Sequence, residues 1–477
     1  MSAPTVSRPR LARPRPPAPA APAATAPVVA PWRALVAGCV ALAALSLLLP
    51  SAPTYDPWSW IIWGREVAGG ELVTTNGPSW KPLPVLFTTP FSLFGDGAAP
   101  LLWLVVARAG GLLGIALAAR LAARVAGPVA GAAAGIAVAA SDAFLYHAAR
   151  GNSEGLLVGL TLWAVERHLD GRRASAFVLG TAAALLRPEL WPFWGLYGLW
   201  LAWRHPRTRA LVAAGFAAVP LLWFVPEWLG SGDFLRAASR ARQPNLDSPA
   251  YAPFPALEVV KLSLQMLPLV TAVGAVACVG AALRRRQSTH DRMVLAFAAA
   301  AVTLVLGVAA MTQGGFSGNL RYVLLPVAFV CVLGAAGWVE AVRAARRHLG
   351  RAAAVALAAV GFAGAAWALA GQAEQLDGEQ FAARREALAV QDLSRAVAGA
   401  GGAARINGCG TGVFTTRFQV PLVAWTLGRH LDEVEIFPFP PGAALAPKGS
   451  ALSRDPRFVA VARTTRWAVR MSCDSGP

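Results

Sequence analysis

Ionisable side chains lie at the ends of many apolar runs in this sequence, and these ends would all face the same side of a membrane. If those ends face the outside of a membrane, Arg and Lys are not needed there for topology, because positive charge marks cytoplasmic loops. Ionisable groups at membrane depth are costly and mark polar cavities. Since these residues belong to many different runs, we expect them to converge on one outward-facing cavity. They are Asp56, Arg65, Lys81, Arg150, Glu154, Arg187, Glu189, Arg236, Arg240, Arg242 and Arg321.

Acids beside a basic cluster suit a reaction in which a bound phosphate meets a reacting hydroxyl. Cations hold phosphate oxygens, and a carboxylate accepts a proton or binds a metal. A structural alternative is that the charges pair between helices, for example Arg187 with Glu189 or Glu154. A further alternative for Arg236, Arg240 and Arg242 is contact with anionic lipid headgroups of the outer leaflet. The sequence leaves these alternatives open.

An aromatic stretch, residues 55–66, follows the first long apolar run and carries Asp56. Trp60, Trp63 and Val67 are spaced to share one helical face, and Trp and Tyr favour the headgroup level of a bilayer. We therefore expect a short helix that lies on the membrane surface. Asp56 either caps this helix, with Pro57 at the first helical position, or belongs to the functional site.

The composition indicates a polytopic membrane protein. Of the 477 residues, 56% are hydrophobic and only 14% are charged, whereas about 25% are charged in a typical soluble domain. A net charge of +18 would suggest nucleic-acid binding in a soluble protein. Here the Arg residues form short clusters between apolar runs, as in cytoplasmic loops, so we expect no nucleic-acid partner. Without HExxH, CxxC, Walker-type or GxSxG motifs, zinc protease, NTPase and hydrolase functions lack support.

The chain divides into three regions. Residues 1–31 are rich in Pro, Ala and Arg and are expected to be a disordered cytoplasmic tail. Residues 32–371 are expected to form an all-α membrane domain of about eleven spans with a large first outer loop, residues 51–99. Each expected inner loop carries at least two Arg, which predicts a multi-pass plasma-membrane protein with a cytoplasmic N-terminus and an extracytoplasmic C-terminus.

Residues 372–477 are expected to form a small extracytoplasmic α/β domain. Outside the cytoplasm, Cys409 and Cys473 can form a disulfide that joins the first and last strands, and two buried thiols are the alternative. Cys39, Cys278 and Cys331 lie inside apolar runs and are expected to be small core residues. The expected elements are a helix at 372–400, strands at 403–407, 433–437, 458–463 and 468–471, and a helix near 420–431.

Four motifs, in this order and on these sides of the membrane, resemble the GT-C superfamily of membrane glycosyltransferases. The closer likeness is to the branch of protein O-mannosyltransferases and lipid A aminoarabinose transferases, and it covers roughly residues 32 to 340. The second motif departs from the His-Pro-Pro-Leu type step of many relatives. The motifs are Tyr55-Asp56, Lys81-Pro82-Leu83-Pro84 through Phe94-Gly95, Ser141-Asp142 through Glu154, and Arg321-Tyr322.

The resemblance implies inverting transfer of a sugar from a polyprenyl-phosphate-linked donor to an envelope glycan, lipid or protein, at the outer membrane face. Asp56 would be the general base, or a carboxylate that binds the acceptor or a metal, and Glu154 would be the second acid. Lys81 and Arg321 would hold the donor phosphate. Further candidates for donor phosphate or lipid are Arg150, Arg187, Arg236 and Arg240, and candidates for stacking on sugar or lining the lipid entrance are Tyr55, Trp58, Trp60 and Trp80.

Two rival functions use the same residues differently. A transporter or flippase for a lipid-linked sugar would bind the phosphate without a base, and a non-catalytic membrane subunit would bind a partner through its tail.

Because the leaving group is already a phosphate, transfer needs no strong general acid. No cofactor is indicated by a ligand set, and a divalent metal stays open.

Overall fold

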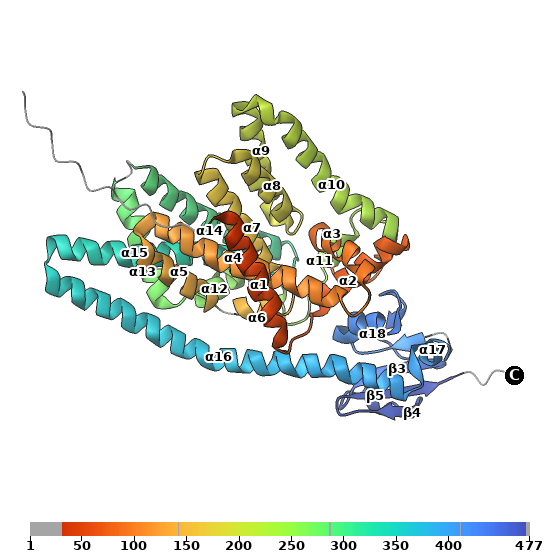
Figure 1. The fold of residues 1–477 in the computed structure, drawn as a ribbon. Helices are drawn as coiled ribbons and strands as arrows, with labels where there is room; N and C mark the ends of the chain where they lie inside the picture. Colours follow the sequence, from red (N-terminus) through yellow and green to blue (C-terminus); the bar gives the residue numbers. More distant parts are fainter. Residues whose placement is uncertain (1–30, 142, 286–287, 411, 474–477) are drawn as a thin grey trace, which may run out of the picture.

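The computed structural model describes residues 31–141, 143–285, 288–410 and 412–473. The expected disordered tail, except for its last residue, and Asp142 of the third motif lie outside these residues. Most of the described chain is a bundle of helices, with a small sheet domain at one end (Figure 1). The bundle helices are α1 Trp32–Leu45, α2 Tyr55–Gly69, α3 Pro82–Phe91, α4 Ala99–Ala126, α5 Pro128–Ala139, α6 Phe144–Ala149, α7 Glu154–Leu169, α8 Arg173–Ala184, α9 Trp191–Arg204, α10 Arg209–Ser231, α11 Arg236–Ala241, α12 Pro255–Gln265, α13 Leu269–Arg285, α14 Thr289–Gln313, α15 Leu324–His348 and α16 Arg351–Gly399.

The expected number of about eleven spans is not confirmed. Among the described residues, 5 helices are long and apolar enough to cross a membrane, or 6 if the bent pair α12 and α13 is one span. The 5 are α4, α10, α14, α15 and α16. Several runs expected to be whole spans form shorter helices instead, such as α5 and α8 with 12 residues each, where about 20 are needed to cross a bilayer.

Helices α4 and α7 pack closely because glycines stand at their contact. A Cβ built on Gly159 would lie 2.5 Å from the carbonyl oxygen of Gly110, and one on Gly110 would lie 2.6 Å from the Cα of Leu156. Small residues allow helix backbones to approach in this way. The contact fixes the start of α7, where Glu154 lies.

Most side chains of helix α2 are buried inside the protein. Trp60 and Trp63 are fully buried, and Trp58 is 6% exposed. Thr54, not Asp56, precedes the helix as its N-cap residue, and Asp56 lies in the first turn. The aromatic residues of α2 are therefore packed inside the protein, and the position of this helix at the membrane surface stays a prediction.

Helix α16 runs without a break for 49 residues from the bundle into the tail domain (Figure 1). It includes both the last expected span and the expected helix at 372–400, which the sequence treats as separate elements. Trp467 and Arg466 of the tail bind this helix: the indole Nε1 donates to the carbonyl of Ala389 at 2.9 Å, and the Arg466 amide donates to Asp392 at 2.7 Å.

The tail domain holds a mixed five-stranded sheet in the order β2-β1-β3-β5-β4. Strand β1 is parallel to β2 and β3, whereas β5 is antiparallel to β3 and β4. Residues 403–407, expected as a strand, belong to helix α17, and neither β1 nor β3 was expected. The elements are α17 Gly402–Asn407, β1 Gly412–Phe414, α18 Val420–Leu427, β2 Val434–Glu435, β3 Gly442–Pro447, β4 Val459–Arg463 and β5 Trp467–Ser472.

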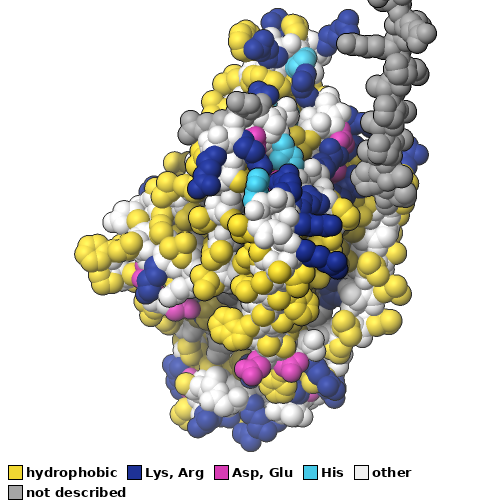
Figure 2. Space-filling view, turned by 90° about the vertical axis from the view of Figure 1, so that its left-hand side faces the viewer, with side chains coloured by type: hydrophobic (Ala, Val, Ile, Leu, Met, Phe, Trp, Pro, Cys, Tyr) yellow, Lys and Arg dark blue, Asp and Glu magenta, His cyan; other side chains and the backbone are white. Residues whose placement is uncertain are grey.

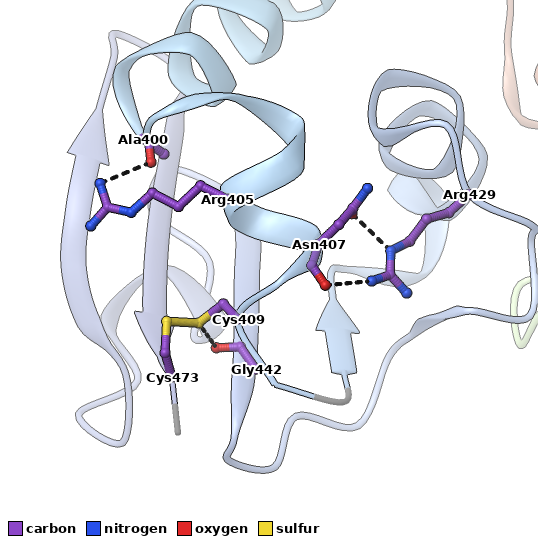
Figure 3. The surroundings of a disulfide bond; sticks show 7 residues. All are labelled: Ala400, Arg405, Asn407, Cys409, Arg429, Gly442 and Cys473. Atoms are coloured by element: carbon purple, nitrogen blue, oxygen red, sulfur yellow. Dashed lines mark hydrogen bonds between the residues drawn. A yellow bond between two sulfur atoms is a disulfide. The ribbon is translucent and has the colours of Figure 1, made fainter. Parts of the chain in front are cut away.

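Cys409 and Cys473 form a disulfide across 64 residues of sequence. Figure 3 shows it linking the segment after α17 to the end of β5. Beside it, the guanidinium of Arg429 donates to the side chain of Asn407 at 2.8 Å and to its carbonyl at 3.2 Å. These contacts hold α17 against the segment that follows α18.

The opposite end of the bundle, seen in Figure 2, carries the turn between α15 and α16. Lys and Arg side chains gather on this end between hydrophobic surfaces, and Asp and Glu are fewer. Arg346, Arg347 and Arg351 flank the turn. Arginines are thus concentrated where the sequence predicts loops on one side of a membrane.

Candidate active site

Five charged residues from distant parts of the chain meet at the end of the bundle nearest the tail domain. We call Asp56, Lys81, Glu154, Arg187 and Arg321 the charged cluster. Each lies in the first turn of a helix or directly before one: α2, α3, α7, and the short 3-10 helices at Pro188–Leu190 and Leu320–Val323. Helix N-termini carry partial positive charge and favour anions, so the backbone adds to the effect of the cations.

Arg321 connects the two carboxylates of the cluster. Its Nη2 donates to Asp56 Oδ2 at 2.7 Å, and its Nε lies 3.6 Å from Glu154 Oε1. Its Nη1 donates to the side-chain oxygen of Asn152 at 3.2 Å, and Asn152 also accepts from Thr54 at 2.9 Å. Asn152 thereby fixes the orientation of the guanidinium relative to the start of α2.

Glu154 and Arg187 form a buried ion pair beneath Arg321. The guanidinium of Arg187 also stacks on the ring of Tyr322, 4.0 Å from its centroid, and lies 3.8 Å from Glu189. The pairing predicted as the structural alternative is therefore present. One carboxylate oxygen, Glu154 Oε2, is buried and has no hydrogen-bond partner among the described residues.

Lys81 lies at the centre of the cluster with its ammonium group buried. Its Nζ donates to Ser153 Oγ at 3.3 Å and stands 4.9 Å from the centroid of the Trp60 ring. Burial, together with the like charge of Arg187, lowers the pKa of Lys81 to about 8, and Glu154 opposes that shift. The cluster thus holds an ammonium group that titrates close to neutral pH.

Asp56 is a carboxylate held in its ionised form. Burial alone would raise the pKa of Asp56, but the positive charges of Arg321 and Lys81 outweigh burial and hold that pKa below its usual range. The side chain keeps 16% exposure. It is therefore an anion at physiological pH that remains accessible from the adjoining cavity.

Two cavities of opposite character meet at the charged cluster. A polar cavity of about 360 Å³ is lined by Asp56, Lys81, Arg321 and Tyr322. An apolar cavity of about 300 Å³ is lined by the aromatic rings of Trp80, Trp191, Trp223 and Phe224, and it reaches the same Lys81 and Tyr322. A ligand with a charged head and an apolar chain would fit with its head at Lys81 and its chain among the rings.

The remaining predicted cations have different surroundings. Arg150 lines the polar cavity and pairs with Glu386 of α16. Arg240 also lines it, and its Nε donates to the carbonyl of Gly77 at 3.0 Å. Arg236 points elsewhere: it donates to the carbonyl of Pro78 at 2.8 Å and lies 3.4 Å from Glu227, so it fastens the loop before Lys81.

Two other cations from the predicted set lie outside the charged cluster. Arg65 donates to the carbonyl of Arg429 in the tail domain at 2.8 Å. Arg242 lies over the ring of Phe316, 4.9 Å from the centroid. Neither of them lines the polar cavity.

The predicted aromatic residues divide between cavity and core. Tyr55 lines the polar cavity, and Trp80 lines the apolar one. Trp60 is fully buried beneath Lys81, and Trp58 is packed against Trp425 of the tail, with centroids 6.0 Å apart. Trp58 and Trp60 therefore belong to the packed core next to the charged cluster and line neither of the two cavities.

Sequence reasoning left three contributors out of the candidate set: Asn152, Ser153 and Tyr322. Asn152 and Ser153 directly precede Glu154, and Tyr322 directly follows Arg321. Their adjacency to chosen residues was the available signal, since the start of a helix brings consecutive residues to one place. The candidates were chosen as charged residues or as aromatic residues near the first outer loop, and these three side chains fell in neither group.

The carboxylates of the site offer few ligands to a metal ion. Among the described residues, no group of three or more His, Cys, Asp or Glu is arranged to hold one. Asp56 and Glu154 each contact an arginine instead.

Comparisons with known proteins identify the fold. No protein-family model matches the chain, and no curated protein matches it. The structure of ArnT from Cupriavidus metallidurans bound to undecaprenyl phosphate is similar with a TM-score of 0.54 and 16% identity, over 94% of this chain and 99% of that chain. The apo state of that ArnT gives 0.52 and 15%, over 92% and 97%.

Archaeal oligosaccharyltransferase AglB from Archaeoglobus fulgidus, in complex with an inhibitory peptide and a dolichol-phosphate, is more distant. Its TM-score is 0.45 at 12% identity, over 87% of this chain and 70% of that chain. ArnT, in contrast, matches this chain nearly end to end. The resemblance seen in the sequence is confirmed at the level of fold, which this chain shares with ArnT.

Proposed function

We propose that the protein is a membrane glycosyltransferase that moves a sugar from a polyprenyl-phosphate-linked donor to a cell-envelope acceptor on the extracytoplasmic face. The observation that carries the proposal is the meeting of the polar and apolar cavities at Lys81 and Tyr322. A polyprenyl phosphate has the matching form, a charged head on an apolar chain. The shared fold with ArnT, whose structure contains undecaprenyl phosphate, supports this choice of donor.

The donor phosphate belongs beside Lys81 and Arg321. Both cations line the polar cavity, and Lys81 also borders the apolar one. As the sugar departs, negative charge grows on the phosphate, and fixed cations in a buried site stabilise that charge strongly. Glu154 keeps Arg187 and Arg321 in position and so contributes through its neighbours.

Transfer occurs by direct displacement with inversion. A hydroxyl of the acceptor attacks the anomeric carbon, the bond between that carbon and the phosphate oxygen breaks, and its electrons leave with the polyprenyl phosphate. Asp56 accepts the hydroxyl proton. A carboxylate of low pKa suffices, because the hydroxyl becomes strongly acidic as its oxygen bonds to carbon.

The extracytoplasmic location of the site is supported by the tail domain. Its disulfide, Cys409–Cys473, is typical of proteins in oxidising compartments. The tail docks on the C-terminal part of α2, where His430 contacts Glu66 at 2.8 Å, and it lines the same cavity as Asp56. If the tail is outside the cytoplasm, the charged cluster is on the same side of the membrane.

The first prediction concerns Asp56→Asn, measured with labelled lipid-linked sugar from host membranes and envelopes of a strain lacking the protein as acceptor. We expect the transfer rate to fall by about 10²–10⁴-fold, as for loss of a general base. Undecaprenyl phosphate binding should remain, because the cations are intact. Asp96→Asn, which changes an exposed carboxylate, is the matched control.

Transfer by Asp56→Asn at the wild-type rate would show that the catalytic role is wrong. A wild-type protein that binds undecaprenyl phosphate but transfers no sugar would favour the transporter instead. In that case, reconstituted vesicles should show movement of the lipid-linked sugar between leaflets, and Asp56→Asn should leave that movement unchanged.

A further inference from the structure

The tail domain forms part of the wall of the polar cavity. Arg417 and Phe418 line it together with Asp56 and Arg321. Both belong to a single 3-10 turn, Arg417–Gln419, between β1 and α18. Both side chains are exposed, Phe418 to 61%. An exposed aromatic side chain and an exposed cation thus border the cavity from the tail.

The position of this turn is fixed by contacts that the residues following it in the tail make with α2 and with the segment after α2. The docking loop, residues 428–433, binds α2 and the segment after it: Thr75 donates to Asp432 at 2.7 Å, and Asn76 donates to the carbonyl of Leu431 at 3.3 Å. The guanidinium of Arg65 lies over the ring of Trp425 in α18, 5.2 Å from the ring centroid. These contacts attach the tail to the helix that carries Asp56.

The polar cavity has an excess of positive charge on the tail side. Within the described chain, Arg321 and Arg150 each have a carboxylate partner, but neither Arg240 nor Arg417 has one within ion-pair distance. Arg240 donates to the backbone carbonyls of Gly77 and Gln243 and also interacts with the neutral side chain of Tyr55. Two cations without carboxylate partners border the same cavity and can bind an anion.

This anion is distinct from the donor phosphate. A phosphate whose chain lies in the apolar cavity must sit where the two cavities join, at Lys81 and Tyr322. Arg240, Arg417 and Phe418 line the polar cavity and not the apolar one. Arg321 also lines only the polar cavity, but it pairs with Asp56. Arg240 and Arg417, which have no carboxylate partner among the described residues, therefore remain for the other substrate.

We infer that Arg417 and Arg240 bind an anionic group of the acceptor and that Phe418 packs against its apolar or ring face. The inference rests on the proposed function and gives it a substrate class: an acceptor with a phosphate or carboxylate near the hydroxyl that reacts. The tail domain is then a specificity element, because it supplies Arg417 and Phe418 from outside the bundle.

The test uses the full-length protein with the same labelled donor and envelope acceptor. At limiting acceptor, Arg417→Gln should lower transfer about tenfold or more, the usual effect of losing a hydrogen bond to a charged group, and Arg417→Lys should restore part of it. Binding of undecaprenyl phosphate should stay within about twofold of wild type, whereas Lys81→Gln should abolish it. Arg463→Gln, an exposed arginine on strand β4 at the far edge of the sheet, should behave as wild type.

The dependence of the transfer rate on ionic strength tests whether the acceptor is anionic. Transfer at limiting acceptor should fall with ionic strength more steeply in wild type than in Arg417→Gln, because salt screens the interaction that the variant lacks. Equal slopes would overturn the anionic acceptor, and wild-type transfer by Arg417→Gln would overturn the role of the tail. Weakened undecaprenyl phosphate binding in Arg417→Gln would assign the residue to the donor. A wild-type protein that transfers no label would instead overturn the proposed function itself.

Discussion

Arg321 links the two acids of the charged cluster through one planar group. Its guanidinium contacts Asp56 and Glu154 and is oriented by Asn152. A lysine carries the same charge but cannot present donors in a fixed plane. The geometry of the site therefore depends on arginine at this position, and charge alone would not reproduce it.

A second prediction follows from the pKa of Lys81, which burial lowers to about 8. The ammonium group is charged below that pH and neutral above it, so kcat/KM for the donor should fall as pH rises through about 8. Lys81→Arg should keep its charge and lose this fall, since arginine stays protonated to above pH 12. A wild-type profile that stays flat to pH 10 would contradict the role of Lys81 in donor binding.

A third prediction separates the structural and catalytic roles of Glu154. Glu154→Gln leaves the buried Arg187 with only the more distant Glu189 as a charged partner and should destabilise the protein by up to about 3–5 kcal/mol. The double variant Glu154→Leu/Arg187→Met should recover much of that stability, because apolar replacements of a buried pair are often neutral, yet remain inactive. Thermal unfolding in detergent and transfer assays measure the two effects, and an active double variant would show that the pair is only structural.

At the level of residues, the sequence predicted the members of the cluster better than their contacts. Asp56, Lys81, Glu154 and Arg321 stood out because charge is costly near a membrane. The sequence could not decide whether Arg187 pairs with Glu154 or with Glu189, because that depends on side-chain positions in three dimensions. The structure has both, with Glu154 the nearer.

The helices position the cluster because so many of them begin at the same end of the bundle. The alternation of apolar runs and Arg-rich loops predicts this arrangement, since each pair of runs returns the chain to the same side. Burial of α2 was not predictable in this way. Its apolar residues look alike whether they face lipid or protein, and only the helices and tail around them decide.

A fourth prediction tests the contact of α4 with α7. In Gly159→Ala, the new Cβ would lie 2.5 Å from the carbonyl of Gly110, and overpacking of this kind costs about 1–3 kcal/mol. The unfolding temperature should fall, and transfer should fall with it because Glu154 begins α7. Gly307→Ala in α14, whose new Cβ would have no atom within 4 Å, is the matched control and should be neutral or slightly stabilising. Equal unfolding temperatures for the two variants would contradict close packing at Gly159.

In the whole molecule, the tail domain and the bundle form a common site. The tail docks on the C-terminal part of α2, contributes Arg417 and Phe418 to the polar cavity, and is closed on itself by one disulfide. The sequence predicted a separate α/β domain but not its contribution to the cavity. Strand β3 was missed because Gly442–Pro447 begins with a glycine and ends with a proline, as a turn does, and its pairing with distant strands overrides that local pattern.

A fifth prediction concerns Cys473→Ser. A disulfide that closes a loop of this length stabilises a domain by about 2–4 kcal/mol, chiefly by restricting the unfolded chain. The tail of the variant should be cut faster by protease, and reductant should accelerate cleavage of wild type but not of the variant. A variant as resistant as oxidised wild type would show that the disulfide contributes little to the tail.

Helix α16 also constrains how this chain can evolve. Its 49 residues join the bundle to the tail without a break, so each inserted residue would turn the tail by about 100° and move it by about 1.5 Å. One inserted residue would carry Arg417 away from the polar cavity, whereas seven would nearly restore the orientation, with an axial shift of about 10 Å. Length changes in the exposed middle of α16 should therefore survive selection only in steps close to two helical turns, and only where the docking loop adapts to the shift.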